Sequence, residues 1–434
     1  MTERSAGSAT YDAAVGSSAA ASLPTWRRVL ASAVLGNVVE WYDNALYGIL
    51  AVFIAKAFFP EGDREAALLG TYIGLIFAYA IRPIAGVLMG RFSDLHGHRR
   101  ALTLSIVLMT LGTVLIGVLP TYAALGIVAP VLLAVCRLIQ GVGASAEYTI
   151  AANFILEHAP PNRRQYLSGW SVGSTSLGPL LASIVSTALL IGLDDAAFQS
   201  WGWRLPFLLA APMGLVTFLI RRSAPELPRS HEQPVQAPFT RALRDHWRQM
   251  LLVIGLGAGQ RVGSFCIQAY FVTALINAGF SQSHALFASI LTYLIGPPAA
   301  IWGGKLADER GGRWVLTIGY SAFVLFTVPT FHALTTTSLA VAVCAVVGFT
   351  FINNFVGAPL THAYVMTFKP EVRGTAAALN YNVGTTLIGS TAPLIAAWLH
   401  GSTGTDASFA WYMTAVCAVS LFIALFAYPR ASSH

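Results

Sequence analysis

Charged residues are scarce in this sequence. Asp, Glu, Lys and Arg together make up only 10% of the 434 residues, whereas soluble domains carry roughly 25%. Hydrophobic residues make up 55%, and the mean hydropathy is +0.63. A chain this apolar is not a soluble globular domain, and the pattern predicts a protein that crosses a lipid bilayer many times.

Cysteine is also rare, and common motifs of metal and phosphate chemistry are missing. The four cysteines, Cys136, Cys266, Cys344 and Cys417, lie singly in apolar stretches without C-x-x-C spacing. They are predicted to be small buried side chains rather than disulfides or metal ligands. No H-E-x-x-H and no Walker-type phosphate loop occurs. We therefore expect a protein without metal or cofactor that is not an enzyme and does not hydrolyse ATP.

Positive charge exceeds negative charge, with a net charge of +7 and a pI near 9.3. Lys and Arg gather in alternate loops between apolar runs, namely Arg91, Arg99 and Arg100, then Arg163 and Arg164, then Lys305, Arg310 and Arg313, then Lys369 and Arg373. Cytoplasmic loops of membrane proteins carry such an excess. We therefore expect a monomeric, multi-pass protein of the cytoplasmic (inner) membrane, with both termini in the cytoplasm and no nucleic acid partner.

Apolar runs of helical length fill most of the chain. They are predicted at about 28–58, 66–89, 100–119, 123–156, 165–191, 204–221, 249–279, 284–303, 313–334, 338–367, 374–399 and 408–428. At about 20 residues per crossing, these runs accommodate close to twelve transmembrane helices. The predicted fold class is an all-α polytopic membrane protein.

The longest hydrophilic interruption, near residues 222–249, divides the predicted helices into two groups of six. We expect a disordered cytoplasmic tail at 1–24, a six-helix bundle at 25–221, a cytoplasmic connector at 222–248, a second six-helix bundle at 249–429 and a short tail at 430–434. The chain is thus predicted to form two bundles.

The two halves also repeat each other in sequence. Gly90-Arg-Phe-Ser-Asp94-Leu-His-Gly97-His-Arg99 recurs as Gly304-Lys-Leu-Ala-Asp308-Glu-Arg-Gly311-Gly-Arg313, at an offset of 304 − 90 = 214 residues. Val172-Gly-Ser-Thr175 recurs as Val383-Gly-Thr-Thr386 at nearly the same offset. Duplication with parallel repeats is a transporter architecture. The two longer motifs are predicted gating turns, in which Gly permits a reversal and Asp and Arg cap or join helices.

The first apolar run holds two carboxylates. Gly36-Asn-Val-Val-Glu-Trp-Tyr-Asp-Asn-Ala-Leu-Tyr-Gly48 places Glu40 and Asp43 inside a stretch long enough to cross the bilayer. An ionisable side chain at the centre of a spanning helix costs roughly 2.5–3.5 kcal/mol, so such residues face a protein interior or a water-filled cavity. At about 100° per residue, the polar side chains form one stripe made of Asn37, Glu40, Asn44 and Tyr47, with Asp43 beside it.

The paired G-x-x-x-D-x-x-G-x-R loops resemble the gating loops of the major facilitator superfamily, although Leu95 and Glu309 depart from its usual pattern. Within that superfamily the chain resembles the metabolite–proton symporter branch, which includes carriers of dicarboxylates, citrate, shikimate, and proline or betaine. The residues that carry this second resemblance are Gly36-Asn37…Glu40-Trp41-Tyr42-Asp43…Tyr47-Gly48, Ile81-Arg82-Pro83-Ile84-Ala85-Gly86, Arg137-Leu-Ile-Gln140-Gly141…Glu147 and Trp201-Gly-Trp-Arg204-Leu-Pro206-Phe. The resemblance implies two six-helix bundles, transport by alternating access and energy from a proton gradient.

Three acids and three arginines are predicted to lie deep in the membrane, namely Glu40, Asp43, Glu147, Arg82, Arg137 and Arg261. Their charges balance, so they are expected to pair with each other or to be hydrated. Arginine presents a planar fork that takes a carboxylate through two hydrogen bonds. Each arginine is therefore a candidate for binding either a structural carboxylate or a substrate carboxylate.

Arg82 is the first candidate for the substrate, because Pro83 weakens the helix there and the resemblance implies an anion site at that position. The alternative is a permanent ion pair with Asp43 or Glu40. Arg137, with Gln140 one turn further on, is either a structural residue or part of the coupling machinery. Arg261, beside Gln260, is expected to face the cavity from the second bundle, or else to lie near a membrane surface with its head in water.

Proton coupling needs a carboxylate whose pKa burial moves toward neutral. Asp43 and Glu40 qualify by position and Glu147 comes next, although Glu147 is equally interpreted as a hydrogen-bonding link to a neighbouring helix. Asp43 is the preferred candidate. His362 also titrates near neutral pH, but a single His in an apolar span is more often a packing residue.

Other side chains complete the predicted substrate site, namely Asn37, Tyr42, Tyr47, Gln140, Trp170, Gln260, Asn353 and Asn380. The amides either bind a polar solute or join helices. The rings either face an ammonium group by cation–π contact or pack in the protein interior. Three deep arginines favour carboxylate-bearing solutes over purely cationic ones.

The expected function is secondary active transport of a small organic anion (carboxylate) or zwitterion together with protons. Protonation of Asp43 or Glu40 is expected to free an arginine, Arg82 first, for the substrate carboxylate. The alternatives are a proton-independent facilitator or exporter of the same fold, and an osmolyte symporter of the proline or betaine type.

Overall fold

The computed structural model describes residues 37–60, 64–96, 98–145, 156, 161–222, 238–335, 338–368 and 373–428. Within these ranges every regular element is a helix. The predicted proton-coupling residue Glu147 and the predicted gating residue Gly97 lie outside the described residues, as do the predicted terminal tails.

The described part of the N-terminal half contains a helix at Asn37–Ile49 and twelve labelled elements. These are α3 (Ala51–Phe58), α4 (Arg64–Ala80), α5 (Arg82–His96), α6 (His98–Val118), α7 (Tyr122–Leu125), α8 (Val128–Ala144), η1 (Pro161–Arg163), α10 (Arg164–Gly192), α11 (Asp195–Ser200), η2 (Gly202–Arg204) and α12 (Leu205–Leu208), followed by α13 (Ala210–Arg222).

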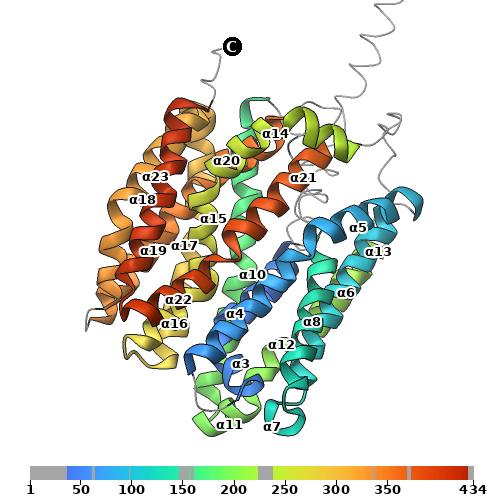
Figure 1. The fold of residues 1–434 in the computed structure, drawn as a ribbon, viewed down its shortest axis with the longest axis vertical. Coiled ribbons are helices and arrows are strands. Elements are labelled where there is room, and N and C mark those ends of the chain that lie inside the picture. The colour runs from blue at the N-terminus through green and yellow to red at the C-terminus, as the bar shows by residue number, and fades with distance from the viewer. Residues whose placement is uncertain are drawn as a thin grey trace, which may run out of the picture.

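The C-terminal half repeats this pattern of long helices. Its elements are α14 (Pro238–Leu256), α15 (Ala258–Phe265), η3 (Cys266–Tyr270), α16 (Phe271–Asn277), α17 (Gln282–Arg310), α18 (Gly312–Leu334), α19 (Leu339–Phe355), α20 (Gly357–Met366), α21 (Arg373–Gly384), η4 (Thr385–Gly389), α22 (Ala392–Thr403) and α23 (Ala407–Phe426). Figure 1 shows the two halves as two groups of helices, the later half on the left and the earlier half on the right.

The described helices account for the predicted membrane crossings. Seven of them are long and apolar enough to span a bilayer, and two bent helix pairs bring the number to nine. Two shorter apolar helices, Thr103–Val118 and Val128–Ala144, cover the third and fourth predicted spans. The eleventh predicted span corresponds to α21, η4 and α22, which follow one another from Arg373 to Thr403.

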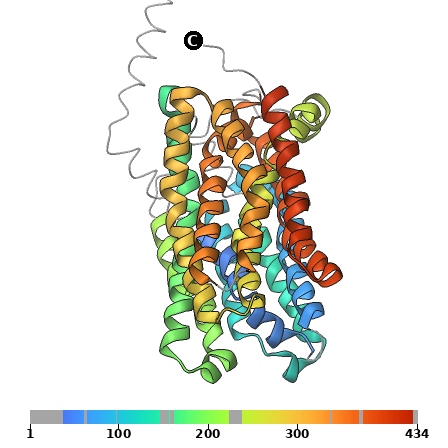
Figure 2. The same cartoon turned by 90° about the vertical axis from the view of Figure 1, so that its left-hand side faces the viewer.

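Two long helices, α10 and α17, join the bundles along their length. The backbones approach so closely that a Cβ atom on Gly169 of α10 would lie 2.6 Å from the carbonyl oxygen of Ala300 in α17. Further along the same pair, the Ser289 hydroxyl donates to Ser183 Oγ at 2.8 Å. Figure 2 shows the long C-terminal helices running side by side along the molecule. Small residues permit such contacts between spanning helices.

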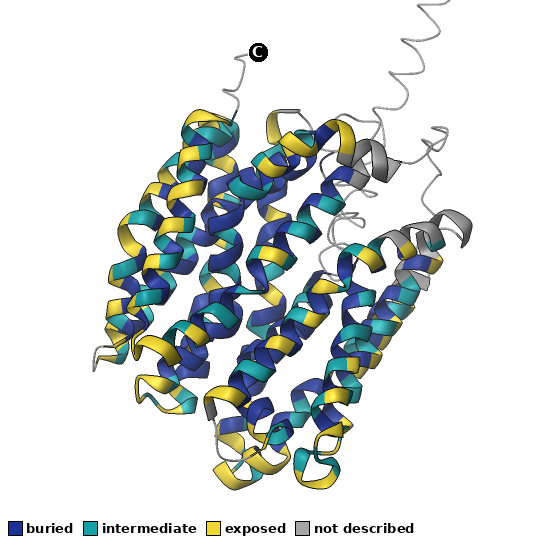
Figure 3. Ribbon diagram, viewed as in Figure 1, coloured by how far each residue is buried: buried dark blue, intermediate teal, exposed yellow. Residues whose placement is uncertain are grey.

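Polarity is arranged as expected for a chain in lipid. Large apolar side chains lie exposed on the outer helix faces, among them Ile84, Leu88, Ile191, Trp411 and Phe426. Ionisable side chains of the spans, including Glu40, Asp43 and Arg137, are instead almost fully buried. Figure 3 shows exposed residues along the outer faces and at the ends of the helices, with buried residues where helices face each other. Because lipid cannot solvate charge, this distribution keeps ionisable groups inside the protein.

Two spans are broken. The first bends by 63° where Asn37–Ile49 meets α3, and the seventh bends by 46° where α14 meets α15. The second break falls at Gly257, within the glycine-rich stretch Gly255-Leu-Gly-Ala-Gly259. Pro297 and Pro298 lie inside the continuous helix α17. Two π-helical turns, η3 and η4, add further irregularity to the seventh and eleventh spans.

Candidate functional site

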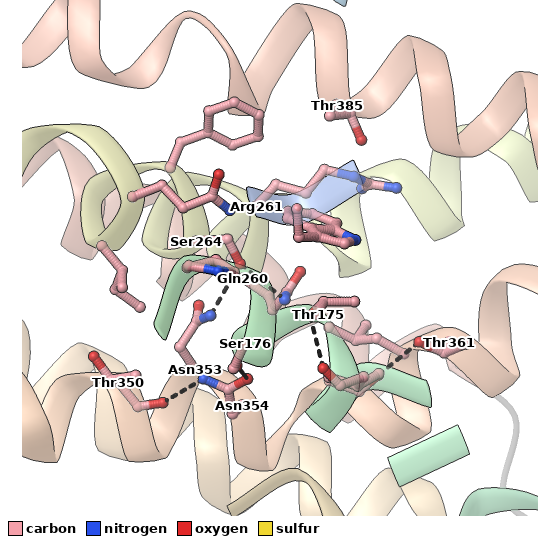
Figure 4. A pocket seen from close by; sticks show the side chains of 18 of the residues that line it. Thr175, Ser176, Gln260, Arg261, Ser264, Thr350, Asn353, Asn354, Thr361 and Thr385 are labelled. Atoms are coloured by element: carbon pink, nitrogen blue, oxygen red, sulfur yellow. Dashed lines mark hydrogen bonds between the residues drawn. The ribbon is translucent and has the colours of Figure 1, made fainter. Parts of the chain in front are cut away.

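A small cavity lies between the two halves of the protein and has a volume of about 70 Å³. Side chains of the first span and α10 line it from one half, and side chains of α15, η3, α17, α19, α20, α21 and η4 line it from the other. Figure 4 shows this central cavity with its polar side chains pointing toward one another. A cavity shared by two bundles is where alternating-access carriers bind substrate.

Arg261 is the one charged side chain among the described residues that line the central cavity. Its Nη1 donates to the backbone oxygen of Ile254 at 3.2 Å, and its guanidinium carbon lies 4.7 Å from the centre of the Tyr364 ring. A Cβ atom on Gly384 would lie 2.7 Å from that guanidinium carbon, so only glycine leaves room for it. The Nε and Nη2 atoms have no hydrogen-bond partner among the residues that the structure describes. A buried guanidinium with two open donors is suited to a carboxylate ligand.

Amide and hydroxyl groups extend the polar wall beside Arg261. Gln260 Nε2 donates to Ser264 Oγ at 3.0 Å, and Asn353 Nδ2 donates to the same oxygen at 2.9 Å. Asn353 Oδ1 is buried and has no hydrogen-bond partner in the described part of the chain. Ser264 therefore fixes two amides from different helices.

The facing wall links the bundles. Ser176 of α10 lies 3.4 Å from Asn354 Oδ1 of α19, and Asn354 Nδ2 donates to the Thr350 backbone oxygen at 3.0 Å. Thr175 donates to its own helix at the Val172 carbonyl, at 2.7 Å. This wall is polar and uncharged, so the positive charge of the central cavity is concentrated on the Arg261 side.

The two carboxylates of the first span lie in a separate network inside the N-terminal bundle. Arg82 Nη1 lies 3.7 Å from Glu40 Oε1, and Arg82 Nη2 donates to Asn44 Oδ1 at 3.2 Å. The Arg82 guanidinium also lies 4.0 Å from the centre of the Tyr79 ring. The structure thus shows the ion-pair alternative for Arg82 and not a position on the central cavity.

Arg137 occupies the same interior. Its Nη1 donates to Gln140 Oε1 at 2.7 Å, and Gln140 Nε2 donates to Thr113 Oγ1 at 2.6 Å. The Arg137 guanidinium lies 4.1 Å from the centre of the Tyr47 ring and interacts electrostatically with Asp43. The two predicted acids therefore belong to one buried charge network with two arginines.

Trp41 connects this charge network to the central cavity. It lies between Glu40 and Asp43 on one helix and lines the central cavity, whereas its acidic neighbours do not. Any rotation or shift of the first span that follows a change in the Glu40–Arg82 pair must therefore move a cavity wall.

The repeated loop of the C-terminal half forms an inter-bundle contact. The carboxylate of Asp308 accepts the backbone N–H groups of Gln165 and Tyr166, at 3.0 and 2.8 Å. These residues form the first turn of α10, whose N–H groups lack partners within the helix. Gly311 has a φ of 90° and ends α17, which agrees with the predicted sharp reversal. The side chains of Asp94 and Arg99 in the other repeat are outside the described residues, and Gly90 lies within α5.

Other predicted substrate-binding residues lie away from the central cavity. Asn37 donates to Ser174, while the Tyr42 and Tyr47 hydroxyls donate to backbone carbonyls of Pro206 and Thr71. These three side chains hold the N-terminal bundle together. Among the predicted candidates, those that line the cavity are Arg261, Gln260 and Asn353.

Two candidates of the long helices are placed differently from the expectation. Trp170 is 43% exposed on α10 and packs against Tyr166, so it faces the outside rather than the cavity. Asn380 is fully buried and donates to the Met250 carbonyl at 2.8 Å, which makes it an interhelical link. Both residues share a helix with cavity residues but point in another direction.

The sequence reasoning missed several cavity residues, although a signal was present. Thr350, Thr361 and Tyr364 line the cavity and, together with Asn354, recur at intervals of three, four or seven residues along one apolar span. That spacing describes a single helical face.

A G-x-S-x-G match at Gly169–Gly173 lies inside α10, whereas a catalytic nucleophile of that motif needs a turn between a strand and a helix.

Several proteins resemble this chain along most of its length. A transporter of glycine betaine, proline, ectoine and pipecolic acid from Dickeya dadantii is 28% identical over 422 residues, which cover 92% of this chain and 83% of that protein. A proline/betaine transporter from Salmonella typhimurium is 28% identical over 417 residues, covering 91% of this chain and 82% of that protein. A candidate proline/betaine transporter from Staphylococcus haemolyticus is 31% identical over 410 residues, which cover 92% of this chain and 87% of that protein.

Solved structures with the same fold include a D-xylose–proton symporter, with a TM-score of 0.75 and 18% identity over 93% of this chain and 98% of that one. A bacterial homologue of the lysosomal transporter Spinster has a TM-score of 0.70 and 15% identity, covering 93% and 98%. The twelve-helix, two-bundle fold is thereby confirmed. The sequence pattern of the Major Facilitator Superfamily matches residues 33–393. The chain is a membrane transporter and belongs to the Major Facilitator Superfamily.

Proposed function

We propose that this protein moves a small zwitterion of the proline or betaine type across the cytoplasmic membrane together with protons, by alternating access. The names of the relatives favour this osmolyte alternative over the organic anion that the sequence led us to expect first. The proposed site is the central cavity. The observation that carries the proposal is that Arg261 lines this cavity with two buried N–H donors that the described residues leave open.

Arg261 suits the carboxylate end of a zwitterion. Its Nε and Nη2 donors are buried and have no hydrogen-bond partner among the described residues. A carboxylate that accepts both donors would satisfy the guanidinium in the bidentate geometry that arginine prefers. The rings of Trp41 and Tyr381 line the same cavity and add aromatic surface, which attracts an ammonium group.

A zwitterion also suits the charge of the site better than a dicarboxylate does. Arg261 is the single cation among the described lining residues, so a second substrate carboxylate would have no cationic partner there. Arg82 contacts Glu40 and Asn44, and Arg137 contacts Gln140, within the N-terminal bundle. One positive group in the cavity matches one carboxylate.

The Glu40–Arg82 pair supplies a route for proton coupling. Protonation of Glu40 would remove the partner charge of Arg82, and the network with Asp43 and Arg137 would then rearrange. Since Trp41 lies between the two acids and lines the cavity, that rearrangement would reach the substrate. In this scheme Arg82 pairs with the coupling acid and Arg261 binds the substrate. From the sequence, Arg82 was instead the first candidate for binding the substrate.

The test is uptake by purified protein in liposomes. We expect labelled glycine betaine or proline to accumulate when the outside is made acidic, and the accumulation to collapse when a protonophore removes the gradient. Succinate and citrate in large excess should compete poorly. Strong competition by succinate together with no uptake of either zwitterion would restore the organic-anion alternative, and gradient-independent equilibration would indicate a facilitator.

A further inference from the structure

A second and larger cavity of about 340 Å³ lies between the bundles, where α4 meets α16 and α22. Figure 1 shows these helices toward the end of the molecule opposite the C-terminus. We call it the outer chamber, because the loop charges predict that the other end faces the cytoplasm. The described residues that line it are Glu65, Leu68, Tyr72, Tyr270, Thr273, Ile276, Asn277, Ala397 and His400.

Each of the three helical segments presents one face to the outer chamber. Glu65, Leu68 and Tyr72 are spaced by three and four residues on α4, and Ala397 and His400 by three on α22. Residues at such spacing share one side of a helix. The Glu65 carboxylate on α4 of the N-terminal half lies against Gly401 on α22 of the C-terminal half. A Cβ atom added to Gly401 would lie only 2.7 Å from Glu65 Oε2. The chamber is therefore built from both halves.

The charge of the outer chamber is opposite to that of the central cavity. His400 Nδ1 lies 2.8 Å from Asp406 Oδ1, and the Tyr270 hydroxyl donates to the same carboxylate oxygen. If His400 is protonated, its positive charge cancels the negative charge of Asp406, and the Glu65 carboxylate gives the chamber its negative charge. If His400 is neutral, both carboxylates contribute. Judged by its described side chains, the outer chamber thus favours a cation in either state, whereas Arg261 makes the central cavity favour an anion.

The two cavities meet at one π-helical turn. In η3, Gln268 lines the central cavity and Tyr270 lines the outer chamber. The Tyr72 hydroxyl donates to the Ala269 carbonyl of this turn at 3.1 Å and lies 3.0 Å from Thr273 Oγ1. This contact between bundles forms the partition between the two cavities. Turns of the π type are rare and often occur at functional sites.

We propose that the outer chamber is a second binding site, which holds the ammonium end of the zwitterion on its way to the central cavity. The Glu65 carboxylate provides the counter-charge, and Tyr72 and Tyr270 contribute aromatic side chains to the lining. The inference rests on the proposed zwitterion function. It assigns the two ends of one substrate to two cavities of opposite charge, ammonium to the outer chamber first and carboxylate to Arg261 next.

The experiment measures binding without transport. Purified full-length protein in detergent is titrated with tetramethylammonium chloride by calorimetry, with sodium chloride at the same ionic strength as the reference. This probe has the ammonium end and no carboxylate, so it cannot make the contact with the Arg261 guanidinium. We expect saturable binding that Glu65→Gln weakens by roughly five-fold, as the loss of one partly exposed charge contact implies. Glu65→Asp should retain most of it.

Asp195→Asn is the matched control. It also removes one exposed carboxylate at this end of the molecule, but Asp195 lies on α11 and does not line the chamber. It should leave tetramethylammonium binding unchanged. Absence of saturable binding, or equal affinity in wild type and Glu65→Gln, overturns the second site. Failure of the proposed function is a separate result, since it would appear as no zwitterion uptake by the wild-type protein whatever the probe does.

Discussion

The carboxylate of Asp308, near the end of α17, accepts two backbone N–H groups at the start of α10, those of Gln165 and Tyr166. The contact joins the C-terminal bundle to the N-terminal bundle through backbone donors. A helix N-terminus carries a partial positive charge and open donors, so a carboxylate there is stabilised. The C-terminal copy of the repeated loop thus holds the two bundles together at this end through backbone polarity.

Asp308→Asn is predicted to loosen that closure. The amide keeps one acceptor but loses the negative charge, and a lost cap contact of this kind costs about 1 kcal/mol. We expect the bundles to separate more often at this end, measured as faster labelling of a single cysteine introduced at Ser168. Glu309→Gln is the control, because that neighbouring carboxylate is exposed and pairs with Lys305 at 3.9 Å. Equal labelling in both variants would contradict the closing role.

Arg261→Lys is predicted to weaken substrate binding severely while keeping the charge. Lysine lacks the planar fork, and the loss of a charge-assisted hydrogen bond of about 1.5–3 kcal/mol corresponds to roughly a 10- to 100-fold rise in Kd. The measurement is thermal stabilisation by glycine betaine and proline, which reports binding by mass action. Arg310→Lys, at an arginine that lies over the Trp314 ring outside the cavity, should behave as wild type. Wild-type affinity in Arg261→Lys would remove Arg261 from the site.

Glu40→Gln is predicted to separate transport from the proton gradient. Equilibration of substrate should continue, but accumulation above the outside concentration should be lost, since the side chain no longer carries a proton. The variant should also lose about 3–5 kcal/mol of unfolding free energy, because the buried Arg82 charge loses its partner. The double variant Glu40→Gln/Arg82→Gln should recover most of that stability. Full accumulation by Glu40→Gln would assign coupling to another residue, with Asp43 next.

Tyr72→Phe is predicted to open the partition at η3. The variant removes one hydroxyl that bonds Ala269 and Thr273 across the bundle interface, which is worth about 0.5–1.5 kcal/mol. We expect faster modification of Cys266, which lies fully buried at the start of this turn, by a small thiol reagent. Tyr122→Phe on α7 serves as the control for loss of a tyrosine hydroxyl elsewhere. No change in the rate of Cys266 modification would show that the hydroxyl does not hold the partition.

The amino-acid sequence predicted the architecture well because that architecture follows from local properties. Apolar length, loop charge and the repeated motifs are read along the chain, and each helix needs only its own residues to satisfy its backbone in lipid. The gating motif also predicted the turn at Gly311, since a left-handed φ of this kind requires glycine.

The site was only partly predictable because it depends on how helices rotate against each other. Arg82 and Arg261 are both deep arginines, and nothing along the chain shows that one faces Glu40 and the other faces the cavity. Trp170 shares α10 with Ser176, yet Trp170 lies on the opposite side from the cavity wall. Helix orientation is set by tertiary packing, so partner choice among buried charges needs the three-dimensional structure.

The π-helical turn η3 has a consequence for how changes in chain length act on this protein. A π-turn holds one more residue than the hydrogen-bonding ladder of an α-helix requires, so deleting one residue between Cys266 and Tyr270 would restore an ordinary α-helix. The turn absorbs that extra residue, so the helix on either side of η3 would keep its phase, whereas the same deletion within α15 would rotate everything after it by about 100°. The helix between the central cavity and the outer chamber can therefore lose one codon at η3 without exchanging its faces.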